Sequence, residues 1–221
     1  MINLKSSKTV LIISFAYPPI AAIGARRVSK LSKELLAIGW TPIIVTARVP
    51  KELFTSKIEI PKELVHHVDW FDSWKWINLL EVNFVGRFIS KVLKKIIPYT
   101  SAGLPEFRRS RWINKAYEKA LLLTKENKID VIYSSFTPPA SIRVAYKLNK
   151  ETNIPWVNEY RDLWTGNPYI KTNLLSEIYN SYIERKLIKN TAALVTVSPP
   201  LQEELIKLHN KNVHVVYNGF D

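Results

Sequence analysis

Cysteine is absent from the 221-residue sequence, and glycine and methionine are scarce, with six and one respectively. The lack of cysteine excludes a disulfide framework and any thiolate metal site, and it fits a reducing compartment. No apolar run approaches the roughly 20 residues that a membrane-spanning helix needs. The apolar segment Thr9–Phe15 is short and is followed by Tyr17-Pro18-Pro19, which is not a signal-peptide cleavage site. We therefore expect a cytoplasmic protein.

Acidic residues are in the minority, 19 against 32 lysines and arginines, so the formal net charge is +13. Such an excess indicates an anionic partner, which is a nucleic acid, an anionic membrane face or a phosphorylated substrate. A basic surface that only aids solubility is the plain alternative. Hydrophobic residues make up 47% of the chain, enough for a full core. Because no repeat or flexible linker is visible, we predict one domain over residues 1–221.

The centre of the chain has the pattern of two parallel strands joined by a crossover helix. Apolar runs that begin at Val131 and Pro155 flank a helical segment from about Ala140 to Lys150. In an open parallel sheet, ligands bind outside the carboxyl ends of the strands. We therefore expect the polar residues at these ends to point into one crevice. These residues are Ser134, Ser135, Glu159, Arg161 and Asp162.

The segments on either side predict further strands and helices of the same sheet. Strands are expected at Thr9–Phe15, Pro42–Thr46, Val65–Phe71, Ala193–Ser198 and Val213–Tyr217, and helices at about Val28–Leu36, Arg109–Leu123, Leu174–Lys189 and from Pro199. In the helix at Leu174–Lys189, we expect Ile178, Tyr182 and Leu187 to face inward. The fold class is thus α/β, a Rossmann-like open, mostly parallel sheet with helices on both faces.

A basic helical insert is predicted at about residues 72–110, after a tryptophan-rich stretch at Trp70, Trp74 and Trp76. Within it, Phe84–Ile97 separates apolar from basic residues as an amphipathic helix does, and Pro98 is expected to end it. The basic residues are Arg87, Lys91, Lys94 and Lys95. Two interpretations stay open: the helix binds an anionic membrane surface, on the inner face of the membrane, or it packs its apolar side into the core.

Several short motifs occur together in a characteristic order. They are Tyr17-Pro18-Pro19 with Gly24-Ala25-Arg26-Arg27, then Ser134-Ser135-x-x-Pro138-Pro139-x-Ser141, Arg161-Asp162-Leu163-Trp164, Val195-Thr196-Val197-Ser198 and Asn218-Gly219-Phe220-Asp221. In this order the chain resembles the N-terminal half of family 4 glycosyltransferases. The resemblance implies the GT-B architecture, in which two Rossmann-like domains face a cleft. The N-terminal domain then holds the acceptor, and the C-terminal domain holds the nucleotide sugar.

The resemblance implies a retaining glycosyltransferase that moves a sugar from a nucleotide donor to a glycan or a lipid-linked saccharide. The donor domain would follow the Asn-Gly-x-Asp segment, so we expect the 221 residues alone to be inactive. A non-catalytic module that binds carbohydrate or a protein partner is the main rival interpretation. A basic nucleic-acid-binding domain is disfavoured, because no recognised nucleic-acid motif is present. GT-B enzymes need no catalytic metal in general, and we expect neither a metal nor another cofactor.

Gly24, Arg26 and Arg27 are candidate acceptor-binding residues at the start of a helix. Backbone N–H groups at such a helix end favour an anion, although a simple helix-start glycine explains Gly24 equally well. The dinucleotide fingerprint and the P-loop are both missing. Two cations in the first helical turn conflict with the helix dipole, and an anionic ligand would relieve this conflict. Alternatively, one arginine pairs with Glu159 or Asp162.

Asp162, with Arg161 beside it, is the first choice for a catalytic group. A carboxylate just beyond the end of a strand is placed to orient or deprotonate an acceptor hydroxyl, while Trp164 stacks on a sugar face. Capping a turn or pairing with Arg161 is the structural alternative. Ser134, Ser135 and Glu159 complete the expected acceptor site.

Overall fold

The computed structural model describes residues 8–20, 22–49, 56–70, 83–101, 110–169 and 174–219. Trp74, Trp76, Arg109 and the last two residues of the Asn218–Asp221 motif lie outside these ranges, as does most of the first part of the predicted insert.

Seven parallel strands form an open sheet in the described part of the chain, in the order β3-β2-β1-β4-β5-β6-β7. The strands are β1 Thr9–Ile13, β2 Thr41–Ala47, β3 Val65–Val68, β4 Val131–Phe136, β5 Trp156–Tyr160, β6 Ala193–Thr196 and β7 Val213–Val215. The predicted α/β class and the central βαβ unit are confirmed. The strand order reverses beside β1, because β1 pairs with both β2 and β4. Ligand sites of open α/β sheets lie at such a point.

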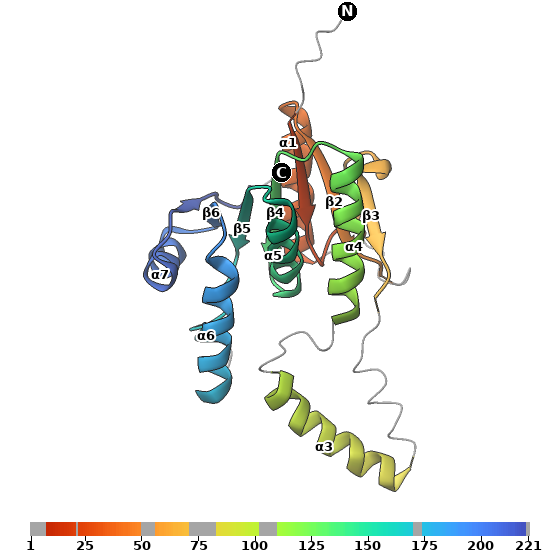
Figure 1. Cartoon of the computed structure of the whole chain (residues 1–221), viewed down its shortest axis with the longest axis vertical. Coiled ribbons are helices and arrows are strands. Elements are labelled where there is room, and N and C mark those ends of the chain that lie inside the picture. Colours follow the sequence, from red (N-terminus) through yellow and green to blue (C-terminus); the bar gives the residue numbers. More distant parts are fainter. Residues whose placement is uncertain are drawn as a thin grey trace, which may run out of the picture.

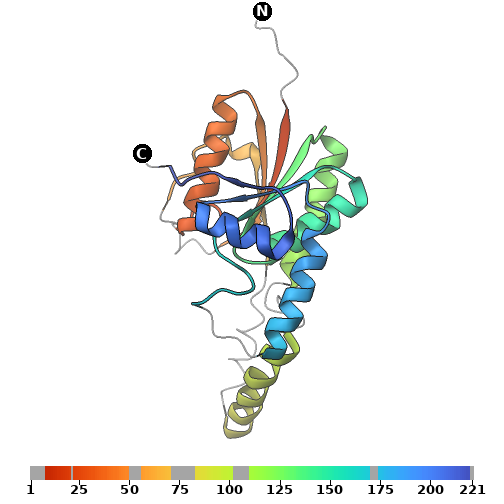
Figure 2. The ribbon, with the colours of Figure 1, turned by 90° about the vertical axis from the view of Figure 1, so that its left-hand side faces the viewer.

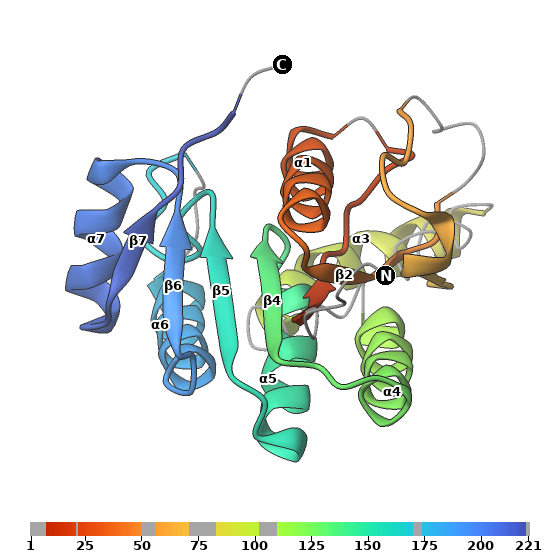
Figure 3. The same cartoon turned by 90° about the horizontal axis from the view of Figure 1, so that it is seen from above.

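Helices cover both faces of this sheet (Figures 1 and 3). The described helices are α1 Ile23–Ala37, α3 Phe84–Ser101, α4 Ser110–Glu126, α5 Ala140–Thr152, α6 Leu174–Ile188 and α7 Pro199–His209, with a short 3₁₀ turn, η2, at Lys62–Leu64. α3 covers neither face and lies beyond the end of the sheet (Figure 1). In Figure 3, α1 lies on one face and α4, α5 and α6 lie on the other. Gly39, at φ 86°, follows the C-terminal end of α1 in the left-handed conformation that glycine adopts readily.

Alternating side chains of the strands form the two halves of the core. Leu11 and Ile13 of β1 join the larger cluster, which also contains Trp112 of α4 and Leu148 of α5. Val10 and Ile12 join the smaller cluster around Val28 of α1. A strand buried on both faces needs the uninterrupted apolar run that the sequence shows here. Ser141, at the start of α5, accepts a hydrogen bond from the Phe15 backbone N–H at 3.1 Å, which fixes the end of β1.

Two expectations about helices are wrong. α3 does not end at Pro98 but continues to Ser101, so the loss of one N–H donor does not terminate it. In α6, Leu187 is buried as expected, but Ile178 and Tyr182 are 59% and 61% exposed. The physical reason is helical periodicity. Ile178 and Tyr182 lie about 180° and about 140° around the helix from the buried Leu187, so both face away from the packed side. The first turns of α6 also project past the sheet (Figures 1 and 2).

Within the described ranges, no helix is long and apolar enough to cross a bilayer.

Strands β1 to β4 run from the N-terminal end of the molecule downward in Figure 1. Their carboxyl ends therefore lie toward the same end as the start of α1, all of α3 and the first turns of α6.

Candidate functional site

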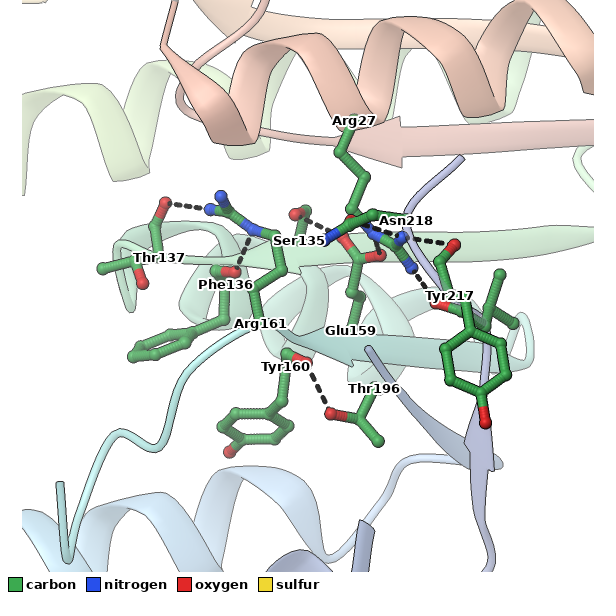
Figure 4. Close-up of polar contacts among 11 residues, drawn as sticks. Arg27, Ser135, Phe136, Thr137, Glu159, Tyr160, Arg161, Thr196, Tyr217 and Asn218 are labelled. Atoms are coloured by element: carbon green, nitrogen blue, oxygen red, sulfur yellow. Dashed lines mark hydrogen bonds and ion pairs between the residues drawn. The ribbon is translucent and has the colours of Figure 1, made fainter. Parts of the chain in front are cut away.

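The candidate site lies where β4 and β5 end beside the N-terminus of α1. Arg161 directly follows β5, and its guanidinium reaches back toward α1 (Figure 4). Its Nε donates to the carbonyl of Phe136 at 2.8 Å, and its Nη2 donates to the carbonyl of Thr137 at 3.2 Å. These two bonds hold the guanidinium plane across the end of the neighbouring strand.

Gly24 lets Arg161 occupy this place. A Cβ atom added to Gly24 would lie only 2.0 Å from Nη1 of Arg161, which no real contact allows. The helix α1 has no side-chain cap and no acidic residue in its first turn. Gly24 is therefore more than a helix-start glycine, since its missing side chain brings a cation against the first turn of α1.

Arg27 forms a buried ion pair with Glu159 of β5. Arg27 Nε donates to Glu159 Oε1 at 2.6 Å, and the Ser135 hydroxyl donates to Glu159 Oε2 at 2.6 Å (Figure 4). The Glu159 side chain is fully buried, and that of Arg27 is 11% exposed. The alternative that one arginine of α1 pairs with Glu159 is thus confirmed for Arg27, and for this residue it relieves the conflict with the helix dipole.

The same guanidinium also holds the chain that leaves β7. Its Nη2 donates to the carbonyl of Val216 at 2.8 Å, and its Nη1 donates to the carbonyl of Tyr217 at 3.0 Å and to Asn218 Oδ1 at 2.9 Å (Figure 4). All three guanidinium nitrogens of Arg27 are engaged within the protein. Arg26, the next residue back, is exposed instead.

Ser134 does not share a crevice with Ser135, which corrects the expectation drawn from the sequence. Successive residues of a strand point to opposite faces, so neighbouring serines cannot face one site. Ser134 is fully buried on the side of Trp156 and Asn158. Its hydroxyl donates to Asn158 Oδ1 at 2.6 Å and accepts from Trp156 Nε1 at 2.7 Å. The structure places Ser134 as a link between β4 and β5.

Asp162 is exposed in the bend after β5, one residue beyond Arg161. Trp164 is half-buried and stacks on Phe136, with ring centroids 6.1 Å apart and an interplanar angle of 23°. One face of the indole is therefore occupied by the core. Of the predicted site residues, the structure brings Gly24 to Arg161 and Arg27 to Glu159 and Ser135, and it leaves Asp162 and Arg26 facing solvent.

A sequence model of Glycosyltransferase Family 4 matches residues 24–221. The chain belongs to glycosyltransferase family 4. No curated protein shows significant similarity to this sequence.

Solved structures share the fold of this family 4 chain. One is the Anabaena protein HepE in complex with UDP and glucose, at 11% identity and a TM-score of 0.55, matched over 97% of this chain and 45% of that one. Another is UDP-N-acetylglucosamine 2-epimerase from Rickettsia bellii, at 12% identity and a TM-score of 0.53, over 94% of this chain and 44% of that one. A third is Phytolacca americana UGT2 complexed with UDP-2-fluoro-glucose and pterostilbene, at 9% identity and a TM-score of 0.52, over 97% and 55%.

The chain spans about half the length of these structures. At such low identities the likeness shows the fold alone, and one of the three proteins is an epimerase. The family match, rather than the fold, therefore narrows the class of activity.

The Tyr133 hydroxyl of the family 4 chain, close to Arg27 and Glu159, stays protonated. Burial, followed by the negative charge of Glu159, raises the pKa of Tyr133 well above its usual value. A neutral tyrosine then donates to a carboxylate that already accepts from Arg27 and Ser135, so three donors hold Glu159. Among the described residues, no group of three or more histidines and carboxylates is placed to hold a metal ion.

Sequence reasoning missed a second buried network of the family 4 chain, around Glu184 of α6. This carboxylate accepts from the Tyr160 hydroxyl at 2.8 Å and from the Thr165 backbone N–H at 3.1 Å, and His209 Nε2 of α7 lies 3.2 Å away. It fixes the loop that carries Asp162 and Trp164. Glu184 lies three residues before Leu187, on the inward side of the predicted helix, and this position was the available signal.

Proposed function

We propose that this chain is the acceptor-binding domain of a retaining glycosyltransferase. The enzyme transfers a sugar from a nucleotide-sugar donor to a hydroxyl of a glycan or a lipid-linked saccharide. The family 4 match over residues 24–221 supports the activity class. The observation that carries the site is the exposed carboxylate of Asp162 next to Arg161, which is held across Gly24 at the carboxyl ends of β4 and β5.

In this proposal, Asp162 orients or deprotonates the acceptor hydroxyl. Within the described part of the chain, Arg161 bonds the carbonyls at the end of β4 through Nε and Nη2, which leaves Nη1 beside α1 for the acceptor. Exposed Arg26 adds positive charge near the same helix start, which suits an acceptor with anionic groups. Arg27, Glu159 and Ser135 act indirectly, because their polar atoms bind one another and hold β5 and α1 at a fixed distance.

The nucleotide sugar reaches this site through a second domain in the same proposal. Neither the P-loop nor the dinucleotide fingerprint occurs in the 221 residues. HepE and UGT2, about twice as long as this chain, were solved with UDP or a UDP-sugar bound. We therefore assign acceptor recognition to the described domain and donor recognition to the part of the fold that this chain does not span.

Substitution of Asp162 tests the proposed role. In the enzyme that contains the donor domain, Asp162→Asn should lower turnover by about 10²–10⁴-fold, the usual contribution of a positioned acid or base. The melting temperature should stay nearly unchanged, because Asp162 is exposed. Steady-state kinetics and thermal melts measure the two effects.

Glu203→Gln is the matched control, since it removes an exposed carboxylate from α7. This variant should keep full turnover. Full turnover in Asp162→Asn would remove Asp162 from the mechanism. Acceptor binding without turnover in the unmodified enzyme would instead favour the non-catalytic carbohydrate-binding module.

A further inference from the structure

α3 exposes an apolar face to solvent. The large apolar side chains that are exposed along it are Phe84, Val85, Phe88, Ile89 and Val92, at 82%, 64%, 66%, 44% and 37%. These residues form pairs of neighbours that recur every four positions, which places them on one side of the helix. Among the residues of α3 up to Val92, whose burial the structure describes, Gly86 and Ser90 are buried. The expectation that the apolar side packs into the core is therefore wrong for these residues.

Positive charge borders this apolar face. Arg87 and Lys91 are exposed one helical turn apart, and Lys94 and Lys95 follow in the sequence. α3 therefore presents both an apolar surface and a basic surface outward, which a helix packed in a core does not do. Helices with this division lie along the interface between headgroups and acyl chains of a bilayer.

α6 carries a second surface of the same kind. Leu174, Ile178 and Tyr182 are 75%, 59% and 61% exposed and recur every four residues, so they form one stripe. The stripe continues through exposed Arg185 and Lys189. Its order is apolar at the projecting tip, aromatic about 12 Å along the axis and basic beyond, because each helical residue rises about 1.5 Å. Membrane proteins place apolar, aromatic and basic residues in this order from the acyl chains to the cytoplasmic side.

Both surfaces lie at one end of the molecule. In Figures 1 and 2, α3 and the first turns of α6 extend beyond the sheet in the same direction, past the carboxyl ends of β1 to β4. A flat partner could therefore touch both helices at once. No described helix is long and apolar enough to cross a bilayer, so such a partner would be contacted from one side.

We propose that α3 and the first half of α6 form a lipid-facing platform that binds an anionic membrane surface. Charge complementarity selects this partner, because the chain has a net charge of +13 and both helices pair basic residues with exposed apolar ones. Anionic headgroups attract the basic residues, while the apolar side chains enter the acyl boundary. The proposal does not depend on transferase activity. If the chain binds a lipid-linked acceptor, the platform faces the membrane on the side where Asp162 lies.

Vesicle flotation of the chain tests the platform. At low salt, we expect binding to vesicles of phosphatidylcholine with phosphatidylglycerol, and at least about tenfold weaker binding to phosphatidylcholine alone. Three double variants should each weaken the binding by about tenfold or more: Arg87→Glu with Lys91→Glu, Phe84→Ser with Phe88→Ser, and Ile178→Ser with Tyr182→Ser.

Matched controls change the same residue types at the opposite end of the molecule. In Figure 1, the ends of α1 and α4 lie opposite to α3. Ile38, which is 71% exposed, directly follows α1, and the exposed Lys125 and Lys128 are in and just after the last turn of α4. Ile38→Ser and Lys125→Glu with Lys128→Glu should bind as the unmodified chain does. Circular dichroism should show all variants folded, since each replaced side chain is exposed.

Three results would rule out specific binding of this end of the molecule to an anionic membrane. They are the absence of binding to anionic vesicles at low salt, equal binding to neutral and anionic vesicles, and equal weakening by the controls. Unchanged binding of the Ile178→Ser, Tyr182→Ser variant would also reject the two-helix platform, because α3 alone would then carry the contact.

Discussion

Gly24 and Arg161 depend on each other although 137 positions separate them in the sequence. The guanidinium has room above the first turn of α1 only because residue 24 has no side chain. Arg161 is in turn held by the carbonyls of Phe136 and Thr137. A methyl group at position 24 would displace the flexible end of Arg161 rather than the backbone, so the change affects the site more than the fold.

A double-mutant cycle measures this dependence. Gly24→Ala should lower acceptor-dependent turnover by about 10²-fold, because a shift of about 1 Å in a positioning group has such an effect. Arg161→Ala should lower it to a similar level. Adding Gly24→Ala to Arg161→Ala should then change turnover little further, since the group that it displaces is already gone. Independent, multiplying effects would show that Gly24 acts without Arg161.

The edge strand β3 shows how burial affects titration in a short element. His66 and His67 are half-buried there, and β3 pairs only with β2 among the described strands. Burial lowers the pKa of His66, and the positive charge of Lys119 lowers it further, while Glu126 opposes both. Burial also lowers the pKa of His67, against a hydrogen bond with the Ala47 backbone. The folded chain therefore favours the neutral form of both rings.

Stability should fall with acidification because of these histidines. Below the unfolded-state pKa of about 6.5, the unfolded chain binds more protons than the folded chain. The contribution is complete above that pH and is lost as the pH falls from about 6.5 toward the lowered folded pKa. Melting temperatures at about pH 8 and about pH 5.5 should differ less for His66→Gln, His67→Gln than for the unmodified chain. An equal difference would assign the acid sensitivity to other groups.

At the scale of elements, the sequence predicts strands and helix starts better than it predicts what each helix covers. The apolar run at Val10–Ile13 and the Pro199-Pro200 helix start have local causes, namely burial on both faces and a preset φ angle. The outward direction of Ile178 and Tyr182 has a local cause, because at 3.6 residues per turn both lie on the far side of α6 from Leu187. How far α6 and α3 extend past the sheet, in contrast, is determined only by the assembled fold.

Some contacts of the candidate site can likewise be inferred from the sequence, and others depend on the assembled fold. A charge conflict visible in the sequence leaves two explanations open, an anionic ligand or a pair between one arginine of α1 and Glu159 or Asp162, and the structure shows the pair of Arg27 with Glu159. The separation of Ser134 from Ser135 also follows from strand periodicity alone. In contrast, the contact between Gly24 and Arg161 arises from the packing of α1 against the end of β5, and no sequence spacing encodes it.

For the molecule as a whole, Arg27 joins α1, β5 and the segment after β7. Arg27→Met should lower the free energy of unfolding by about 3–5 kcal/mol, because it leaves the fully buried Glu159 without its cation. Arg26→Met, one residue away and exposed, should change it by no more than about 0.5 kcal/mol. Urea unfolding followed by circular dichroism measures both values.

Adding Glu159→Gln to Arg27→Met should recover part of the lost stability, since the buried charge is then removed. A double variant less stable than Arg27→Met would contradict this account of the pair.

The hydrogen bonds from Arg27 to Val216, Tyr217 and Asn218 also determine how force on the chain after β7 would be transmitted. Backbone that is fixed by charge-assisted bonds resists torsion, so rotation of the following chain would begin at Gly219. Among the described residues, an added Cβ at Gly219 would meet nothing within 4 Å, so no packed side chain opposes rotation there. Torque at this residue would pass through Arg27 into α1 and β5, at the middle of the sheet. The force would then bypass the three-residue strand β7. A rotation of the chain after Gly219 would instead act on the start of α1, beside Arg161.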